Sequence, residues 1–494
     1  MWRRSRICLL TTGLVLVGPM AGSAAAQTLG PLVEISRPSA VGGCDTGFNA
    51  FGTWPVAEAV EPIVAVNPTR PNHFVAAWIQ GSFQDIITAV SFDGGQNWQR
   101  TPIPLTVCSG GSFPGGGDPW LSFAPNGDLY AVALSGNSPS VLSVMVTKSI
   151  DGSMPWSTPI VIPGSDSADL VADQPRVTAD PTDARFVYVN WQGNSKHFHT
   201  ATDLFSRTTD GGLTWEPARS IFQTGSQAST QSSQILVLPD GTLVYMFQYQ
   251  EEQPNKPITF TSLRLLRSTD KGQTWSGPLD AVTMTPLYTS DNSGKTLIVD
   301  PKTGQLVLDS SDNSFAVDPR NGNLYSVWED GRFSGFQYND IAFSMSSDGG
   351  STWSIPIRVN QTPLNIPPLN RQSFMPSIAV AANGTIAVSY YDFRFNDSTP
   401  GLPTDRWLVQ CNPSSNHLAT DPASWGSEVR LTSTSFNIEA VVPALLGGRF
   451  FLGDYFGMDH SGNNFVTTFT AVDNDKVTSI FARTVGGTVS LTGR

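Results

Sequence analysis

One eight-residue turn recurs along this chain, and its recurrence constrains the fold more than any other feature of the sequence. Its clearest copy is SSDGGSTW, from Ser346 to Trp353. The other copies are SFDGGQNW, TTDGGLTW and STDKGQTW, together with a degenerate copy, SIDGSMPW. Repeats several tens of residues long are typical of structural units that stack on one another. The aspartates of the five copies follow one another at steps of 58, 59, 60 and 78 residues: Asp93, Asp151, Asp210, Asp270 and Asp348.

A longer pattern, two apolar strands joined by a short hairpin, accompanies this turn. Seven copies of the pattern begin at Pro62, Pro119, Pro175, Ser233, Ser314, Pro376 and Tyr455. With a third strand before the turn and a fourth after it, each copy would form a four-stranded antiparallel sheet. Sheets of this kind that are arranged radially bury both of their faces. We therefore predict an all-β protein consisting of a single β-propeller with seven blades, with six blades as the alternative.

The seventh copy needs a fourth strand if the ring is to close. The segment PLVEIS, from Pro31 to Ser36, resembles the fourth strands of the other copies, and the C-terminal GTVSLTG is its competitor. Either segment would remove an exposed strand edge. The insertion that lengthens one step of the repeat is expected between Thr285 and Ser311.

The recurring aspartate is expected to be structural. In a turn between the third and fourth strands, its carboxylate can accept hydrogen bonds from backbone N–H groups of its own loop, while the glycines take positive φ. The tryptophan that ends the turn can pack between neighbouring sheets. A structural role in every sheet explains why the aspartate is repeated, whereas a catalytic aspartate would be needed only once.

The N-terminus has the pattern of a secretory leader. Three arginines among the first six residues precede an apolar run from Ile7 to Val17, and a small-residue segment ends at Ala26. Such a pattern is typical of a cleaved signal peptide. We predict a signal peptide over residues 1–26, a propeller domain over residues 27–494, and a secreted or periplasmic protein. No later run reaches the roughly 20 apolar residues of a transmembrane helix.

Charge and motif content narrow the classes of ligand. The formal net charge is −12 at pH 7, and loss of the leader makes the mature chain more negative. This charge argues against nucleic acid as a partner. The sequence contains no zinc-ligand spacing and no G-x-S-x-G motif, so no cofactor is predicted. Calcium is the alternative, held with backbone carbonyls at blade entrances by Asp118, Asp173, Asp312 and Asp454.

Three cysteines follow the leader. Cys44 and Cys108 lie in Gly-rich loops at the two ends of the first repeat. In an oxidising compartment we predict a disulfide between them. Cys411 is then expected to be a buried thiol.

The recurring turn, S/T-x-D-x-G-x-T-W, resembles the Asp-box or BNR signature of the sialidase superfamily, as found in bacterial secreted proteins. The resemblance implies a propeller and a glycan or glycoconjugate as partner. For a sialidase it also implies three arginines that grip the substrate carboxylate, a tyrosine nucleophile activated by a glutamate, and an aspartate as general acid/base. Catalytic members of the family have six blades. Their R-x-P motif before the first Asp-box has no match here, where Arg37 and Arg70 lie in other settings.

The resemblance places the site on the face of the ring opposite the Asp-boxes. The loops expected there contain acids, arginines and aromatics, which suit an anionic or polyhydroxylated ligand. We predict Tyr455 as the nucleophile, with Tyr391 as the alternative, Glu329 as its base, and Asp118 or Asp173 as the acid. In the motifs WEDGRF and YYDFRF an acid stands two residues before an arginine. The predicted substrate-binding residues are Arg332, Arg371, Arg394, Arg406 and Arg449.

Two functions remain open at this point. One is an exported sialidase-like glycoside hydrolase that acts on terminal glycans, which the cluster of acids, arginines and tyrosine favours. The other is a non-catalytic propeller that binds glycans or proteins at the cell surface, which the missing R-x-P motif favours. If a sialoside is the substrate, at least three of the five arginines must converge on one pocket. The sequence makes no prediction about oligomeric state.

Overall fold

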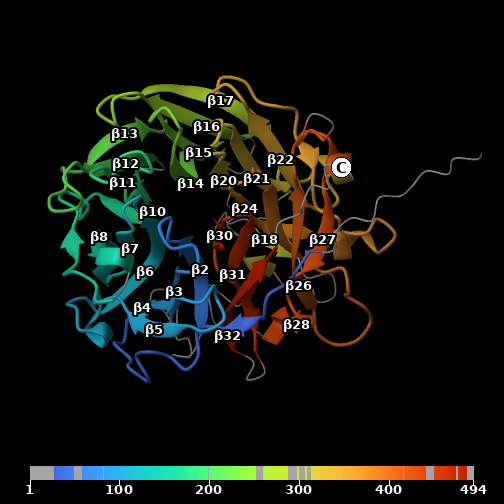
Figure 1. Ribbon diagram of the computed structural model, residues 1–494, viewed down its shortest axis with the longest axis horizontal. Coiled ribbons are helices and arrows are strands. Elements are labelled where there is room, and N and C mark those ends of the chain that lie inside the picture. The colour runs from blue at the N-terminus through green and yellow to red at the C-terminus, as the bar shows by residue number, and fades with distance from the viewer. Residues whose placement is uncertain are drawn as a thin grey trace, which may run out of the picture.

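The computed structural model shows seven four-stranded antiparallel sheets, the blades, arranged around a central axis (Figure 1). The predicted seven-bladed all-β propeller is therefore confirmed. The structure describes residues 27–48, 58–81, 83–152, 154–197, 200–251, 260–287, 297–299, 306–308, 313–414, 417–440, 450–473 and 477–486. The predicted signal peptide lies outside these residues.

The first four blades take their strands in chain order from the axis outward. Blade 1 contains β2 (Ala59–Val66), β3 (Phe74–Gln80), β4 (Asp85–Ser91) and β5 (Gln99–Pro102). Blade 2 contains β6 (Gly115–Phe123), β7 (Leu129–Ser138), β8 (Val141–Ser149) and β9 (Ile160–Val161). Blade 3 contains β10 (Leu170–Ala179), β11 (Val187–Ser195), β12 (Ala201–Thr208) and β13 (Arg219–Gln223). Blade 4 contains β14 (Ala228–Val237), β15 (Leu243–Glu251), β16 (Phe260–Ser268) and β17 (Ser276–Met284).

The remaining blades follow the same order except at the closure of the ring. Blade 5 contains β20 (Ser314–Val317), β21 (Leu324–Asp330), β22 (Asp340–Ser346) and β23 (Ile357–Arg358). Blade 6 contains β24 (Ser373–Val380), β25 (Ile386–Asp392), β26 (Pro403–Cys411) and β27 (Gly426–Arg430), and β28 (Phe436–Asn437) also pairs with β26. Blade 7 contains β30 (Met458–Ser461), β31 (Asn464–Val472), β32 (Thr478–Val485) and β1 (Val33–Glu34).

Helical structure is limited to single short turns in the described residues, and none is long and apolar enough to cross a membrane. They are η1 (Val107–Ser109), η2 (Ile150–Gly152), η3 (Arg332–Ser334), η4 (Pro368–Arg371), η5 (Pro422–Ser424) and η6 (Ile438–Ala440).

The ring is held together by apolar side chains between the faces of neighbouring blades. The first strand of each blade contacts the first strand of the next, from β2 through β6, β10, β14, β20 and β24 to β30, which contacts β2 again. Trp78, Trp191 and Trp328 are each the fifth residue of a second strand, and each is fully buried. Burial of both sheet faces explains why the second strands are nearly continuous apolar runs.

The N-terminal segment closes the ring. β1 pairs antiparallel with β32, which places Val33 opposite Ala482 and Glu34 opposite Phe481. Beyond this pairing, the backbone N–H of Ile480 donates to Ser36 Oγ at 2.9 Å. Of the two segments that the sequence offers for this position, PLVEIS is therefore used, and GTVSLTG lies outside the described residues.

The recurring turns at Asp93, Asp210, Asp270 and Asp348 form the predicted local hydrogen bonds from backbone N–H groups to the aspartate carboxylate. In the clearest copy, Asp348 Oδ1 accepts from Ser346 Oγ at 2.7 Å and from the N–H of Thr352 at 2.9 Å, and Oδ2 accepts from Thr352 Oγ1 at 2.6 Å. Gly350 has a φ of 93°, and a Cβ there would lie 2.6 Å from Leu265 Cδ2 of the preceding blade. The turn needs glycine for its backbone and for close packing between blades.

We expect these turns to make folding stability depend on acid pH. Hydrogen bonds from Thr352 and Ser346 lower the pKa of Asp348 to about 2, and similar bonds lower the pKa of Asp93 and Asp210 to about 2. A carboxyl whose folded pKa is depressed stabilises the fold above its unfolded pKa of about 4, and that contribution is lost as the pH falls through about 2. Tryptophan fluorescence between pH 5 and pH 1.5 should therefore show unfolding in this window.

The substitution Asp348→Asn tests the contribution of a single turn, because it leaves the other recurring turns unchanged. Because the turn is exposed and its charge is screened, the substitution should cost no more than about 1 kcal/mol at pH 7. It should also flatten part of the pH dependence, since an amide cannot titrate. An identical acid transition in wild type and variant would show that the turns do not carry the effect.

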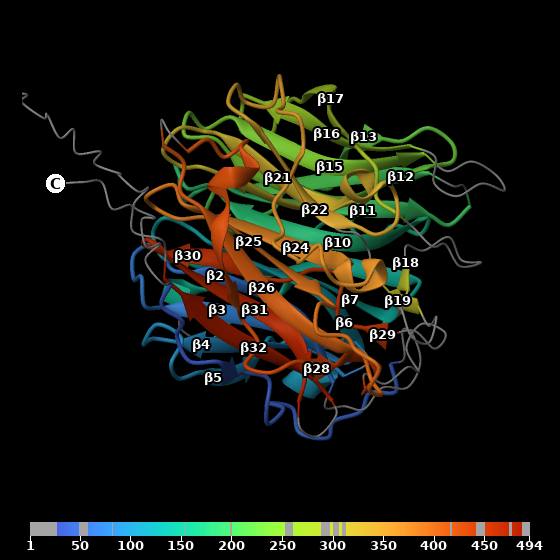
Figure 2. The same ribbon diagram turned by 90° about the vertical axis from the view of Figure 1, so that its right-hand side faces the viewer.

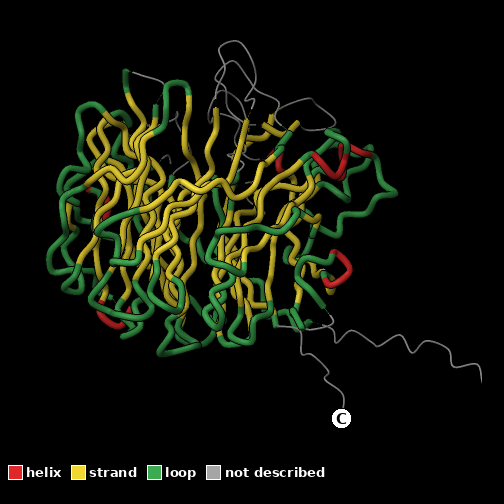
Figure 3. Tube along the Cα trace, turned by 90° about the horizontal axis from the view of Figure 1, so that it is seen from above, coloured by secondary structure: helices red, strands yellow, loops and turns green. Residues whose placement is uncertain are grey.

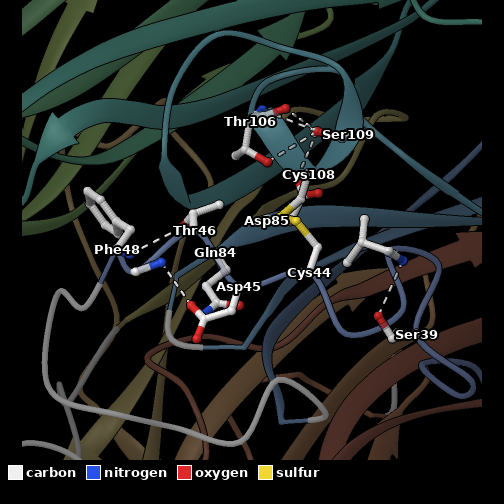
Figure 4. The surroundings of a disulfide bond; sticks show 12 residues. Ser39, Cys44, Asp45, Thr46, Phe48, Gln84, Asp85, Thr106, Cys108 and Ser109 are labelled. Atoms are coloured by element: carbon white, nitrogen blue, oxygen red, sulfur yellow. Dashed lines mark hydrogen bonds between the residues drawn. A yellow bond between two sulfur atoms is a disulfide. The ribbon is translucent and has the colours of Figure 1, made fainter.

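The disulfide between Cys44 and Cys108 joins the loop before blade 1 to the loop between blades 1 and 2 (Figure 4). Its two Cα atoms are 5.8 Å apart. Hydrogen bonds lie on both sides of it: Gln84 Nε2 donates to Asp45 Oδ1 at 2.8 Å, and Ser109 Oγ donates to Asp85 Oδ1 at 3.0 Å. The third cysteine, Cys411, is a buried thiol whose pKa burial raises to about 12.

The insertion between blades 4 and 5 contributes to a small extra sheet. β18 (Leu297–Val299) pairs antiparallel with β19 (Leu306–Leu308), and β19 pairs parallel with β29 (Phe450–Phe451), which precedes blade 7. Figure 2 shows the three strands together at one side of the ring, away from the C-terminus. The connections into blades 5 and 7 are thus tied to each other on that side.

Candidate functional site

The loops of the propeller form two layers, one at each end of the strands (Figure 3). One layer holds the turns between third and fourth strands, which include the recurring turns of the sequence. The other layer, which we call the top face, holds the connections between blades, the hairpins between second and third strands, and the small sheet of β18, β19 and β29. The predicted site residues belong to segments at or near the top face.

A repeated bulge marks the first strand of five blades. Each bulge contains a non-glycine residue with positive φ: Glu61 at 56°, Asp118 at 52°, Gln174 at 45°, Ser232 at 50° and Met375 at 50°. In each case the pairing with the second strand shifts register at that point. A bulge changes the direction of the side chains on its strand. It also interrupts the hydrogen bonds between the two strands, so that backbone N–H groups can donate to other partners.

The bulges are linked from blade to blade by hydrogen bonds. Asp118 Oδ2 accepts from the N–H of Gln174 at 3.1 Å, and Gln174 Oε1 accepts from the N–H of Ser232 at 3.0 Å. Ser232 Oγ accepts from the N–H of Asn313 at 3.2 Å. Glu329 Oε1 accepts from the N–H of Met375 at 2.8 Å, so it caps the bulge of blade 6. Asp118 and Glu329 therefore each connect neighbouring blades.

Four blades contribute to a cluster of side chains near the axis, which we call the axial cluster: Glu61, Asp118, Trp120, Arg176 and Tyr455. The Arg176 guanidinium lies 4.0 Å from the centre of the Trp120 ring and 5.5 Å from that of Tyr455. The two rings meet edge to face, with centroids 5.4 Å apart. Trp120 is half-buried, whereas Arg176 and Tyr455 are buried. The structure thus brings the predicted Asp118 and Tyr455 together with three residues that the sequence analysis missed.

The Tyr455 phenol is held in its neutral form. Its OH donates to the Pro119 carbonyl oxygen at 3.0 Å. Burial, followed by the negative charges of Glu61 and Asp118, raises the pKa of Tyr455 well above 10. Ionisation is therefore unfavourable in this state, and the phenol acts as a hydrogen-bond donor and an aromatic surface.

A signal for the missed residues was present in the sequence. Glu61, Asp118 and Gln174 each precede a proline, at the start of three of the seven recurring patterns. Trp120 and Arg176 stand two residues after their bulges, at equivalent positions. An alignment of the copies on this proline would have shown that Trp120 and Arg176 occupy equivalent positions in their strands. It would not have shown that their side chains are in contact.

The four described arginines among the predicted substrate-binding residues have separate partners. Arg332 Nε lies 2.8 Å from Asp330 Oδ1, and its Nη2 donates to the Thr283 carbonyl at 2.6 Å. Arg371 Nε donates to the Ile366 carbonyl at 2.8 Å. Arg449 lies outside the described residues.

In blade 6, Arg394 and Arg406 have contrasting environments. Arg394 pairs with Asp392 at 2.7 Å and Glu428 at 2.6 Å, and stacks 3.6 Å above Trp407. Arg406 is fully buried and donates to the Met375 carbonyl at 2.7 Å and to two serine hydroxyls. Both guanidinium groups are occupied by contacts within the protein.

The other predicted residues have partners of their own. Asp173 Oδ2 accepts from Asn194 Nδ2 at 3.2 Å at the edge of blade 3. Tyr391 is buried, and its OH donates to the Thr470 carbonyl at 2.7 Å. Its neighbour Tyr390, which the sequence analysis did not select, donates to Glu428. Burial and the Glu428 charge raise the pKa of Tyr390 well above 10, so this phenol is neutral as well, although its partner is a carboxyl group and that of Tyr455 is a backbone carbonyl.

No group of three or more His, Cys, Asp or Glu side chains in the described part of the chain could hold a metal ion. Of the aspartates considered for calcium, Asp118 and Asp173 take the contacts given above, and Asp312 lies outside the described residues.

Comparison with known proteins gives no family by sequence: no family model matches the chain, and no curated protein matches it. Similar solved structures include a protein of unknown function from Dyadobacter fermentans, with 13% identity, a TM-score of 0.44, and coverage of 93% of this chain and 99% of that one. The Hadza microbial sialidase Hz136 has 14% identity and a TM-score of 0.47, and the match covers 83% of this chain and 74% of that one. A GH93 α-L-arabinofuranosidase of Fusarium graminearum has 11% identity and a TM-score of 0.47, with coverage of 93% and 98%.

Proposed function

We propose that this protein is an exported propeller that recognises glycans through the axial cluster on its top face. The observation that carries the proposal is the stack of Arg176, Trp120 and Tyr455 beside the carboxylates of Asp118 and Glu61. Sugar rings present apolar C–H faces and many hydroxyl groups. Aromatic surfaces bind the former, and carboxylate and guanidinium groups bind the latter.

Each residue of the cluster has a distinct role in this proposal. Trp120, which is half-buried, offers the surface on which a sugar ring lies. Arg176 holds the indole in place by its cation–π contact of 4.0 Å and supplies N–H donors. Tyr455 is fixed by its bond to the Pro119 carbonyl and supports the indole from the side. The excess of carboxylates favours a neutral, hydroxyl-rich glycan over an acidic one.

Hydrolysis of the bound glycan is the second candidate function. The observation that favours it is the presence of two carboxyl groups, of Glu61 and Asp118, close enough to Tyr455 to raise the pKa of its phenol. Most glycoside hydrolases use two carboxyl groups, one as acid and the other as base or nucleophile. Asp118 Oδ2 accepts from the Gln174 N–H at 3.1 Å, a bond that holds the carboxyl group in a fixed orientation.

The binding proposal is tested by Trp120→Ala on a glycan microarray, followed by calorimetry with the best ligand. We expect a loss of affinity of at least about tenfold, which corresponds to 1.4 kcal/mol. Trp98→Ala is the matched control, because Trp98 ends an Asp-box turn on the opposite face. Thermal unfolding of both variants checks that they are folded. Equal affinity in wild type and Trp120→Ala would contradict the proposal.

Hydrolysis is tested with fluorogenic glycosides, including a sialoside and an α-L-arabinofuranoside. If the protein is a hydrolase, Asp118→Asn should reduce turnover by at least about a hundredfold, since general acid or base catalysis contributes 10² to 10⁴. Arg332→Ala should leave turnover nearly unchanged if the substrate is neutral, and should abolish turnover of a sialoside if Arg332 binds its carboxylate. Glycan binding without turnover of any substrate would establish a binding propeller.

A further inference from the structure

A cavity lies between blades 6 and 7, away from the axial cluster. It has a volume of about 630 Å³ and is bordered by the segment from Thr432 to Asn437, by β31 and β32, and by the N-terminal strand that closes the ring. We call it the seam pocket. In Figures 1 and 2, β28 lies next to β32, which shows where these segments meet. Its volume is within the range of about 300–1,000 Å³ that is usual for small-molecule sites.

The inner wall of the seam pocket is apolar and aromatic. Phe436, Phe469 and Phe481 line it together with Leu32. The rings of Phe469 and Phe481 are stacked, with centroids 6.2 Å apart and planes at 24°. Phe481 is half-buried, so part of this aromatic surface is open to the pocket. Such a wall suits the C–H face of a pyranose.

Polar groups on the rim have hydrogen-bonding capacity left for a ligand. Ser433 and Thr434 are exposed, and their hydroxyls make no hydrogen bond to any residue that the structure describes. Asn437 Oδ1 accepts from the N–H of Leu402 at 2.7 Å and of Glu439 at 3.1 Å. These two bonds fix the orientation of the Asn437 amide, and its Nδ2 remains as a donor. Two hydroxyls and one amide are the groups that commonly bind sugar hydroxyls.

One end of the seam pocket is charged. Arg37 Nε lies 2.9 Å from Asp473 Oδ2 and 3.6 Å from Glu34 Oε1. Asp473 also accepts from Ser479 Oγ at 3.0 Å and from the Val477 N–H at 3.1 Å, so its position is fixed. Among the residues that the structure describes, two carboxylates pair with one guanidinium at this end, which leaves it negative. An anionic ligand is therefore disfavoured, whereas the carboxylates can accept hydrogen bonds from sugar hydroxyls.

From these contacts we infer that the seam pocket is a second carbohydrate site, which takes a neutral pyranose unit of a glycan. The ring lies against Phe481 and Phe436, and its hydroxyls bond to Ser433, Thr434 and Asn437 at the rim. The site goes beyond the proposed function, because it shares no residue with the axial cluster. A glycan held there would be anchored beside the ring closure, independently of what the axial cluster binds.

The test uses saturation-transfer NMR on the full mature protein with methyl glycosides of glucose, galactose, mannose and N-acetylglucosamine as probes. We expect transfer from the protein to at least one of them. Thr434→Trp should block the rim and reduce that signal at least fivefold, and Phe481→Leu should weaken it while keeping an apolar side chain. Ser226→Trp is the control, since Ser226 is an exposed serine between blades 3 and 4 and does not line the pocket.

The outcomes separate this site from the axial cluster. Loss of the signal in Thr434→Trp with an unchanged signal in Trp120→Ala and Ser226→Trp supports the seam pocket. Loss in Trp120→Ala alone would assign the sugar to the axial cluster and overturn the inference. No transfer to any of the four glycosides in the wild type would overturn it as well. Thermal unfolding of Phe481→Leu checks that a lost signal does not reflect an unfolded protein.

Discussion

Replacing Arg406 by alanine is expected to lower the free energy of unfolding by about 3–5 kcal/mol, the range found for emptying a large buried site or breaking a buried charged network. Arg406 is fully buried in blade 6. Its guanidinium donates to the Met375 carbonyl at 2.7 Å and to Ser377 and Ser389 Oγ at 2.8 and 2.9 Å. It also lies 4.4 Å from the Tyr391 ring centre. Alanine would leave a cavity and deprive the Met375 carbonyl of a donor.

The environment of Arg406 explains why the effect should be large. No carboxylate of the described residues pairs with it, and burial lowers its pKa to about 10. Through the peptide of Met375, it is connected to Glu329, which accepts from the N–H of the same residue at 2.8 Å. Removal of the guanidinium therefore disturbs the bulge that joins blades 5 and 6, as well as the local packing.

Two further variants separate packing from hydrogen bonding and from charge. Arg406→Met keeps most of the volume but cannot donate, so it should cost less, about 1–3 kcal/mol. Arg185→Ala is the surface control: the Arg185 side chain is 72% exposed and pairs with Asp183 at 2.7 Å. Its loss should leave the midpoint of unfolding nearly unchanged, because exposed ion pairs contribute little to stability. Denaturant unfolding gives all three values, and an equal cost for Arg406→Ala and Arg185→Ala would refute the structural role of Arg406.

Removing the disulfide is expected to cost about 4 kcal/mol, because Cys44 and Cys108 are 64 residues apart and the bond restricts a loop of that length in the unfolded chain. The bond connects the segment before blade 1 to the loop that leads into blade 2. The segment between the two cysteines forms blade 1 and the loop before it in the folded protein. Without the bond, this segment is unrestricted in the unfolded chain. The measurement is the midpoint of denaturant unfolding for the double variant Cys44→Ser, Cys108→Ser.

Reduction provides the matched control for this double variant. Dithiothreitol should destabilise the wild type by the same amount and leave the double variant unchanged, because the remaining Cys411 is a buried free thiol. A wild type that is insensitive to the reductant, together with a double variant of unaltered stability, would show that the bond does not contribute. Thiol counting on the denatured, unreduced mature chain should find one free cysteine.

Features that depend on a few neighbouring residues followed from the sequence. The recurring turn could be predicted because its donors and acceptor lie within one turn: Asp348 bonds to Ser346 and Thr352. The same holds for the number of blades, since each copy of the pattern is one sheet. The ion pair between Asp330 and Arg332 could also have been predicted from the sequence, because two side chains that are two residues apart in a tight turn can contact each other. Interpreted in this way, WEDGRF indicates a local ion pair.

Only the tertiary structure decided which distant segments meet. Trp120, Arg176 and Tyr455 come from three blades and approach one another because the ring closes, and no local pattern encodes that contact. The choice of the N-terminal segment to complete blade 7 likewise depends on packing across the whole chain, since β1 lies beside β32. The seam pocket is a consequence of that closure. The sequence thus determined the repeating unit and its turns, whereas the closed ring determined the partners of the side chains at the axis and at the seam, because these contacts join different blades, whose residues lie from tens to hundreds of positions apart in the sequence.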